Sequence, residues 1–365
     1  MWTRMIIFAY MKAKKRKNLP YKWHNILLPI AIGVGVTWWI FAEQLGDFSW
    51  GEVHMTGRAW WGIALAALML LGREVGYVCR YRFITNGDLT WMQALKVCVM
   101  CEFSSAMTPS SVGGSGLSMV FMHRYGISIG RGTTLMLSTV FFDGLFCVVS
   151  RPLVLLFVPW SELVSPLNVD WIMDPGLLIG LIYGSVVAGT VTLFLGIVVW
   201  PNWMRALLDR LFRLPLLRRW HGKALELGTN MVNASHELRA QSAGWWLKCI
   251  GVTFMSWTCR FLIINALMYA FVDGLDQVLV FARQTVVWLV LIACPTPGGS
   301  GVGEWLFSDF YGDMLATGSV AVVVALLWRV FSYYVFLVMG AVVAPLWLRG
   351  DSDSNSDDEN EQNDK

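Results

Sequence analysis

The sequence contains few charged residues. Asp, Glu, Lys and Arg make up 15% of its 365 residues, whereas hydrophobic residues make up 56%. A soluble domain carries roughly a quarter charged residues, so this composition excludes an ordinary soluble fold. The apolar runs at 26–44, 58–79, 131–158, 177–200, 244–271 and 317–347 can each cross a bilayer, which takes about 20 residues. We therefore predict an all-α polytopic membrane protein with about six full transmembrane helices.

The sequence also lacks the common patterns of metal binding, nucleotide binding and catalysis. Its five histidines are scattered, and its seven cysteines show no zinc-site spacing. It contains no Walker motif for nucleotide phosphates. We therefore expect no cofactor, no metal site, no catalytic residues and no direct use of ATP, and we expect membrane lipids rather than nucleic acids as partners.

Lysine and arginine are distributed unevenly between the loops. Residues 1–23 and 201–243 hold seven each, whereas the loops at 45–57 and 159–176 hold none. Cytoplasmic loops carry the excess of positive charge, so the N-terminus and the connector at 201–243 are predicted to be cytoplasmic. The connector is either an amphipathic helix on the inner leaflet or an ordinary basic loop. The acidic tail at 350–365 is predicted to be disordered and cytoplasmic.

These orientations divide the chain into two membrane halves, 24–200 and 244–349. The run at 58–79 returns to the cytoplasm near Arg80 and Arg82, and the run at 131–158 leaves it at Arg131. Residues 92–126 must then enter and leave the membrane from the cytoplasm. Residues 277–312 lie on the outer side by the same reasoning. The sequence thus predicts two re-entrant helical hairpins in an inverted repeat, which is typical of transporters with a site between the halves.

Each predicted hairpin contains the same short string. Thr108-Pro109 is followed by Gly113, Gly114, Ser115 and Gly116, and Thr296-Pro297 by Gly298, Gly299, Ser300 and Gly301. Pro109 and Pro297 are predicted structural breaks, with Ser115 and Ser300 as N-caps of the restarting helices. The free N–H groups of a helix start attract an anion, so all eight glycine and serine residues are candidate substrate contacts. The alternative is a pair of kinks at tight helix contacts.

Several charged residues lie within or beside the apolar runs. Glu102 precedes the first glycine string and Glu304 follows the second, while Asp143, Arg151, Arg260 and Arg329 lie deep in apolar sequence. Such residues are costly in lipid and should face inward and pair. Arginines favour phosphate, so Arg260 and Arg329 are predicted to bind a phosphate group together with Glu102 and Glu304. Either acid is also a candidate for coupling to protons. A purely structural salt-bridge network is the alternative.

The segment from Cys294 to Glu304 resembles a motif of flippase-like membrane proteins related to the transmembrane region of lysylphosphatidylglycerol synthases. Residues 108–116 resemble an earlier glycine-rich segment of that family, and the resemblance covers about 24–347. It implies a bacterial inner-membrane protein that moves an anionic phospholipid or lipid-linked headgroup between leaflets. In the larger synthases a soluble catalytic domain follows, whereas this chain ends in an acidic tail, so aminoacyl-lipid synthesis is not expected. The alternatives are a scaffold for a separately encoded lipid-modifying enzyme and a membrane-embedded lipid-modifying enzyme.

Overall fold

The chain folds into a bundle of helices. A computed structural model describes residues 48–107, 113–167, 173–214, 218–294, 296 and 298–344, and every regular element in these ranges is helical. Five helices are long and apolar enough to span a membrane: Gly57–Ile84, Ile129–Leu155, Pro175–Phe194, Ala243–Phe271 and Gly318–Ala344. They correspond to five of the six predicted crossings, and the sixth, at 26–44, lies outside the described residues. The protein is therefore a multi-pass helical membrane protein.

Polar side chains cap the starts of the long helices. Four of the spanning helices are α3 (Gly57–Ile84), α6 (Ile129–Leu155), α8 (Pro175–Phe194) and α11 (Ala243–Phe271). The fifth consists of α14 (Gly318–Arg329), the π-helical turn η6 (Val330–Tyr334) and a further helical stretch to residue 344. Each begins directly after a residue whose side chain accepts a hydrogen bond from the first turn; these residues are Thr56, Ser128, Asp174, Ser242 and Thr317. A cap contributes about 0.5–2 kcal/mol, so these residues fix where each helix begins.

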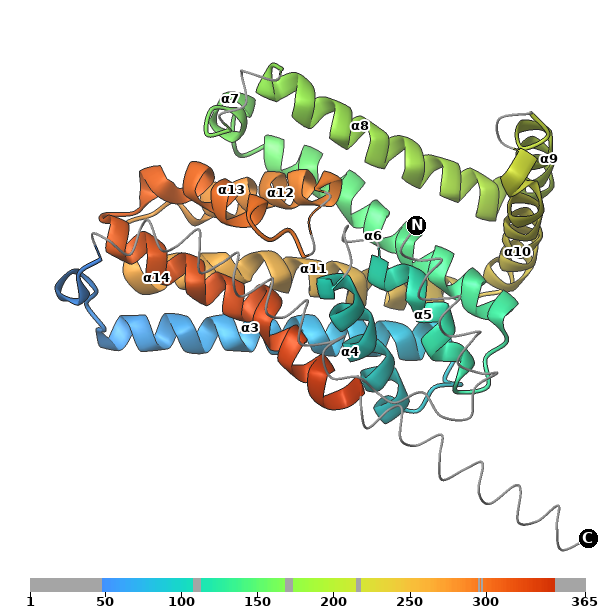
Figure 1. Cartoon of the computed structure of the whole chain (residues 1–365), viewed down its shortest axis with the longest axis horizontal. Helices are drawn as coiled ribbons and strands as arrows, with labels where there is room; N and C mark the ends of the chain where they lie inside the picture. Colours follow the sequence, from blue (N-terminus) through green and yellow to red (C-terminus); the bar gives the residue numbers. More distant parts are fainter. Residues whose placement is uncertain are drawn as a thin grey trace, which may run out of the picture.

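Helices α3 and α11 pack side by side in opposite directions (Figure 1). Small residues allow their close approach. A Cβ at Gly62 would overlap Ala270, and a Cβ at Gly76 would overlap Ser256. The Ser256 hydroxyl donates to the carbonyl of Arg73 at 3.1 Å. Glycine at such contacts is the usual means of packing helices in a membrane, where lipid supplies no hydrophobic drive for helix association.

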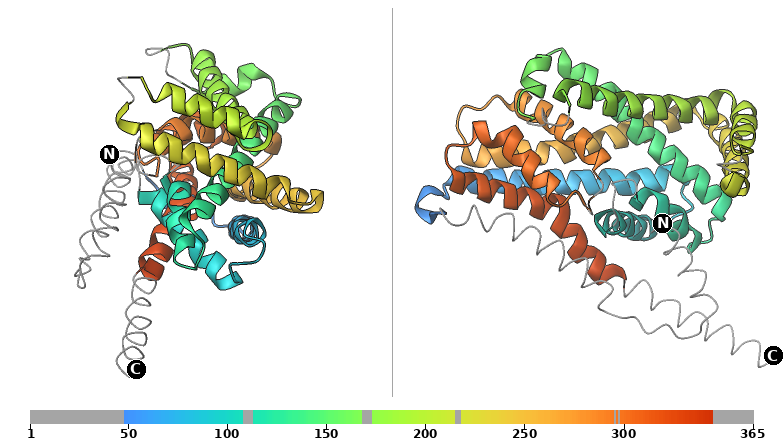
Figure 2. Two further views of the ribbon diagram at one scale, coloured as in Figure 1. Left: turned by 90° about the vertical axis from the view of Figure 1, so that its right-hand side faces the viewer. Right: turned by 45° about the horizontal axis from the view of Figure 1, so that its top comes forward.

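Two pairs of shorter helices lie where the hairpins were predicted. The first pair is α4 (Trp91–Met107) with α5 (Gly113–His123), and the second is α12 (Gln277–Ala293) with α13 (Val302–Tyr311). The second glycine string lies in the break between α12 and α13, whereas the first forms the start of α5. Figure 1 and the right view of Figure 2 place the two pairs in opposite halves of the bundle, α4 and α5 toward the end that carries α10.

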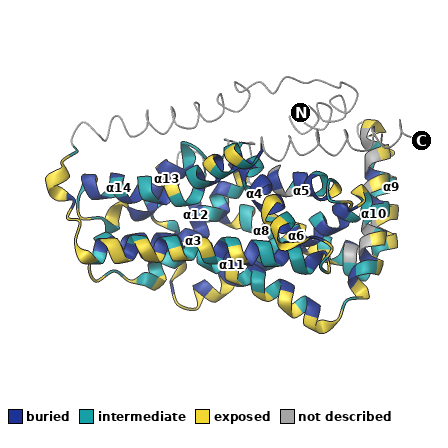
Figure 3. Ribbon diagram, turned by 90° about the horizontal axis from the view of Figure 1, so that it is seen from below, coloured by how far each residue is buried: buried dark blue, intermediate teal, exposed yellow. Residues whose placement is uncertain are grey.

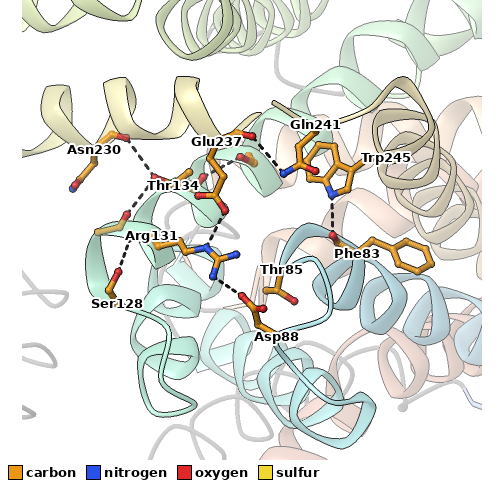
Figure 4. Close-up of polar contacts among 12 residues, drawn as sticks. Phe83, Thr85, Asp88, Ser128, Arg131, Thr134, Asn230, Glu237, Gln241 and Trp245 are labelled. Carbon is orange, nitrogen blue, oxygen red and sulfur yellow. Dashed lines mark hydrogen bonds and ion pairs between the residues drawn. The ribbon is translucent and has the colours of Figure 1, made fainter. Parts of the chain in front are cut away.

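The predicted connector is helical and lies across one end of the bundle (Figure 2). It follows the π-helical turn η3 (Leu195–Val199) and comprises α9 (Pro201–Leu211), η4 (Arg218–Trp220) and α10 (His221–Arg239). Arg131 holds α10 to the bundle by pairing with Asp88 and, at 2.9 Å, with Glu237 (Figure 4). The loop after α3, the start of α6 and the end of α10 thus meet at one end of the molecule.

The outer face of the bundle is apolar. Large exposed hydrophobic side chains lie along its long helices, among them Trp61, Leu68 and Leu71 on α3, Leu181 on α8 and Val338 on the last spanning helix. Figure 3 shows exposed residues along the outer sides of these helices and buried residues between them. A soluble protein rarely exposes so continuous an apolar surface, so lipid is the solvent that this face fits. The helices η2 (Trp50–Glu52), α7 (Trp160–Val164) and η5 (Gly312–Met314) complete the fold.

Candidate headgroup-binding site

A cavity of about 360 Å³ lies inside the bundle. Side chains from α3, α4, α6, α8, α11, α12 and the last helix line it, together with the break between α12 and α13. Its charged lining residues are Arg80, Glu102, Asp143, Arg260 and Arg329. Small-molecule sites measure about 300–1,000 Å³, so the volume is sufficient for a small polar group.

The second glycine string forms a tight turn at the edge of this cavity. Gly298, Gly299 and Gly301 have φ values of 57°, 69° and 83°, a region that residues with a Cβ rarely adopt. Gly298 and Gly299 line the cavity. The prediction that Ser300 caps the following helix is wrong, because Gly301 occupies the N-cap position. The Ser300 hydroxyl instead forms a hydrogen bond with Tyr333, and Pro297 lies outside the described residues.

Glu304 occupies the amino terminus of α13. Its Oε2 accepts a hydrogen bond from the Gly301 N–H at 2.8 Å and another from Arg329 Nη2 at 2.7 Å. Arg329 Nη2 also donates to the carbonyl of Gly299 at 2.8 Å. The sequence predicted an incoming anion at this helix start, but a carboxylate of the chain itself already lies there. The residue following Arg329 begins η6, and π-helical turns within long helices are often found at functional sites.

The first glycine string has a different role from the second. It opens α5, which begins at Gly113, so Ser115 lies within the first turn and the prediction that it is the N-cap is wrong. A Cβ at Gly114 would overlap the Cys101 carbonyl and the Ser105 hydroxyl, so Gly114 allows α4 and α5 to pack closely. A Cβ at Gly116 meets open space. This pair of helices reaches the cavity through α4, by Glu102 and Ser105 among others, and Pro109 lies outside the described residues.

Arg260 differs from the other arginines of the cavity. Its guanidinium stacks over the Trp288 ring at 3.9 Å and lies 5.2 Å from the Trp257 ring. Among the described residues no carboxylate lies within ion-pair distance of it, and its side-chain hydrogen bond is to Tyr77. Arg260 and Arg329 line the same cavity, while Glu304 lies behind Arg329. Arg260 is therefore a cation that remains available for an anion.

Three further charged residues complete the site, and sequence reasoning missed their role. Arg80 was predicted at the cytoplasmic boundary, but it is 4% exposed and pairs with Asp143. The prediction was wrong because α3 continues to Ile84, so Arg80 still lies inside the bundle. Arg73 pairs with Glu102, and Glu74 is its second carboxylate neighbour at 3.3 Å. Arg73 and Glu74 lie inside the predicted span at 58–79. The expectation that charged residues within an apolar run face inward and pair, which was applied to Asp143, would therefore have identified them as well.

Four polar atoms around the cavity lack partners among the described residues. They are Arg80 Nε, Trp288 Nε1, Arg329 Nε and Ser332 Oγ, all buried and all on residues that line the cavity. A buried polar group without a hydrogen bond costs about 1–3 kcal/mol. Three of the four can only donate, so a ligand with several acceptor oxygens would satisfy them.

Two further buried arginines, Arg283 and Arg151, do not line the cavity. Arg283 is held by both oxygens of Asp313, at 2.6 and 2.9 Å, and by the Phe310 carbonyl at 2.7 Å. Arg151 donates to the Thr285 carbonyl at 3.1 Å and to Ser150 at 3.0 Å. These two arginines join α12 to α6 and to the turn after α13, which is a structural role.

Comparison with known proteins extends over nearly the whole chain. Residues 26–340 match the family described as the lysylphosphatidylglycerol synthase TM region. A UPF0104 membrane protein of Archaeoglobus fulgidus is 20% identical over 332 residues, covering 87% of this chain and 95% of the relative. No solved structure matches with statistical significance. The family match includes both glycine strings and every charged residue of the cavity, and the chain therefore belongs to the family of the lysylphosphatidylglycerol synthase transmembrane region.

Proposed function

We propose that the protein moves a lipid with an anionic headgroup between the leaflets of a bacterial inner membrane. One observation carries this proposal: a cavity between apolar helices is lined by Arg260, which has no carboxylate partner among the described residues, and by four residues that each carry a buried polar atom without a hydrogen bond to that part of the chain. A phosphate group would supply both the charge and the acceptors. The apolar outer face of the bundle leaves the acyl chains in lipid.

The headgroup would bind first through Arg260. The Trp288 and Trp257 rings hold this guanidinium by cation–π contacts, which fix its direction without neutralising it. Arg80 and Arg329 would add their free Nε–H groups. Because both are already paired with carboxylates, they contribute orientation more than charge.

The arrangement of the helix pairs supports an alternating-access mechanism. We propose that α4 with α5 and α12 with α13 are re-entrant hairpins that enter from opposite faces, as in an inverted repeat. Residues of both pairs line the cavity, and the pairs lie in opposite halves of the bundle. Rocking of one half against the other would then expose the site to each leaflet in turn.

We propose that the site binds and moves the headgroup rather than transforming it. Its carboxylates Glu102 and Asp143 are each paired with an arginine, so neither is free to act as a general base. Among the residues that the structure describes, no group of His, Cys, Asp and Glu is placed to hold a metal ion. A separately encoded lipid-modifying enzyme would be the source of any modified lipid.

Substitution of Arg260 tests the function directly. In proteoliposomes carrying a fluorescent anionic phospholipid, the wild-type chain should speed exchange between leaflets, and Arg260→Gln should slow it at least tenfold. A charge-assisted contact contributes about 1.5–3 kcal/mol, and 1.4 kcal/mol corresponds to a factor of ten. Arg219→Gln, an exposed change in the connector, is the matched control. If wild-type vesicles exchange lipid no faster than protein-free ones, the proposal is wrong.

Cysteine labelling in a background without native cysteines tests the topology. Single cysteines at exposed positions Glu162 and Gly312 should react with an impermeant reagent in intact cells, and one at Arg219 should react only after permeabilisation. If Gly312→Cys reacts only after permeabilisation, the proposal that the two helix pairs enter the membrane from opposite faces is wrong. Labelling at Arg219 in intact cells would reverse the proposed orientation.

A further inference from the structure

The acids and arginines of the site are not matched one to one. We call the eight residues Arg73, Arg80, Arg260, Arg329, Glu74, Glu102, Asp143 and Glu304 the charged cluster. Arg329 pairs with Glu304, and Arg80 pairs with Asp143. Arg73 alone serves both Glu74 and Glu102, while Arg260 has no carboxylate within ion-pair distance among the described residues. The cluster thus has one surplus acid and one surplus cation.

Glu74 is the surplus acid. Glu102 accepts a direct hydrogen bond from Arg73 Nη2, whereas Glu74 is 3.3 Å from Arg73 Nη1 in a contact without hydrogen-bond geometry. Among the described residues, Glu74 Oε1 is buried without a hydrogen-bond partner, and Oε2 accepts a hydrogen bond only from the weakly donating Cys98 thiol, at 3.5 Å. The side chain is 14% exposed, so water screens its charge poorly. Of the two carboxylates, Glu74 has the weaker stabilisation of its negative charge.

The charges near Glu74 come from three helices. They are Arg73 on α3, Glu102 on α4 and Arg260 on α11, and the Cys98 thiol of α4 donates to Glu74. Glu102 and Arg260 line the same cavity, and Arg73 joins Glu102 to Glu74. Arg260 also acts electrostatically on both acids. When no anion is bound, Arg260 therefore offsets the surplus negative charge of the pair from a distance. An anion that bound to Arg260 would cancel this effect.

We propose that Glu74 takes up one proton when an anionic headgroup binds at Arg260, so that lipid binding and proton binding are coupled. The proton comes from water and adds to Oε1, converting the carboxylate to the acid. Glu102 keeps its bond to Arg73. The inference rests on the proposed function. The proton would be the coupling ion that makes transport directional.

The coupling has a definite sign. Binding effects between two ligands are reciprocal, so if the anion favours the proton, the proton favours the anion. Affinity for the anion is highest at low pH, where Glu74 is already protonated, and falls as the pH rises. With one linked proton the decrease is at most about tenfold per pH unit. A membrane with the more acidic side outside would then favour loading from the outer side and release inside.

Proton uptake on binding tests the proposal on the intact protein. The full chain in detergent and weak buffer is titrated with a short-chain phosphatidylglycerol, while a pH indicator reports protons and tryptophan fluorescence reports binding. We expect close to one proton taken up per lipid bound at a pH above the pKa of Glu74 in the free protein and below its pKa in the complex. Two further titrations identify what the site recognises. Binding of inorganic phosphate would indicate recognition of a free anion, and binding of a short-chain phosphatidylcholine would indicate recognition of any lipid. Binding of phosphatidylglycerol alone would indicate recognition of an anionic lipid.

Each result decides between the two proposals. Binding of phosphatidylglycerol without proton uptake at any pH from 5 to 9 would overturn the coupling and leave the proposed function intact. Absence of binding would overturn both. Glu74→Gln should bind the lipid with an affinity independent of pH and without proton uptake, whereas Glu162→Gln, an exposed change in α7, should behave as wild type. If Glu74→Gln does not fold, the wild-type titration alone decides.

Discussion

Gly299→Leu is expected to reduce lipid translocation to the rate of protein-free vesicles while the protein still inserts. Gly299 has φ of 69°, and its Cβ would lie 2.8 Å from the Leu291 side chain. Forcing this conformation on leucine costs about 1–2 kcal/mol before any clash. The turn would have to move, and its carbonyl would no longer hold Arg329 at 2.8 Å. The measurement is leaflet exchange of an anionic phospholipid, with membrane abundance determined in parallel.

Matched variants separate this effect from general damage. Gly312→Leu lies in an open turn at the end of α13 with nothing within 4 Å of the added Cβ, and it should keep the wild-type rate. Ser300→Ala removes one hydrogen bond to Tyr333, worth about 0.5–1.5 kcal/mol, and should be milder. Gly114→Leu should instead lower the amount of folded protein, because its side chain would meet the α4 backbone. Full activity of Gly299→Leu would show that the second glycine string serves helix packing and does not form part of the binding site.

Glu304→Gln is expected to destabilise the protein by about 3–5 kcal/mol. Arg329 is 3% exposed and Glu304 is 5% exposed, so the change leaves a buried guanidinium without its counter-charge. Thermal unfolding in detergent measures the loss, with Glu162→Gln as the exposed control. The double variant Glu304→Gln with Arg329→Gln should recover part of the stability, because both charges are then absent. Equal melting of Glu304→Gln and wild type would show that water or lipid solvates Arg329.

The helical architecture was largely predictable from the sequence because the length of each apolar run sets it locally. Five predicted crossings and both helix pairs lie where the apolar runs and glycine strings placed them. The boundary at Arg80 was misplaced for a physical reason. In a sequence, an arginine after an apolar run indicates the end of a membrane span. A helix can nevertheless continue past a buried arginine that pairs with an aspartate on a neighbouring helix. Asp143, the partner of Arg80, lies 63 positions away in the chain, so the sequence around Arg80 does not reveal the pair.

The detailed roles within the site could not be read from the sequence. The two glycine strings look alike, yet one supplies left-handed turn residues beside the cavity and the other allows α5 to approach α4. The difference depends on what lies opposite each glycine. The pairing of charges has the same origin: Arg260 and Arg329 both lie in apolar sequence, and only packing determines that Glu304 reaches Arg329 while Arg260 stacks on Trp288.

The headgroup dependence of translocation tests the central claim most directly. Proteoliposomes with the wild-type chain are loaded with fluorescent analogues of phosphatidylglycerol or phosphatidylcholine that share the same acyl chains, and leaflet exchange is followed by chemical quenching from outside. Because Arg260 and the unpaired donors select for negative charge, we expect the anionic lipid to exchange at least tenfold faster. Equal rates for the two lipids would contradict an anion site in the cavity.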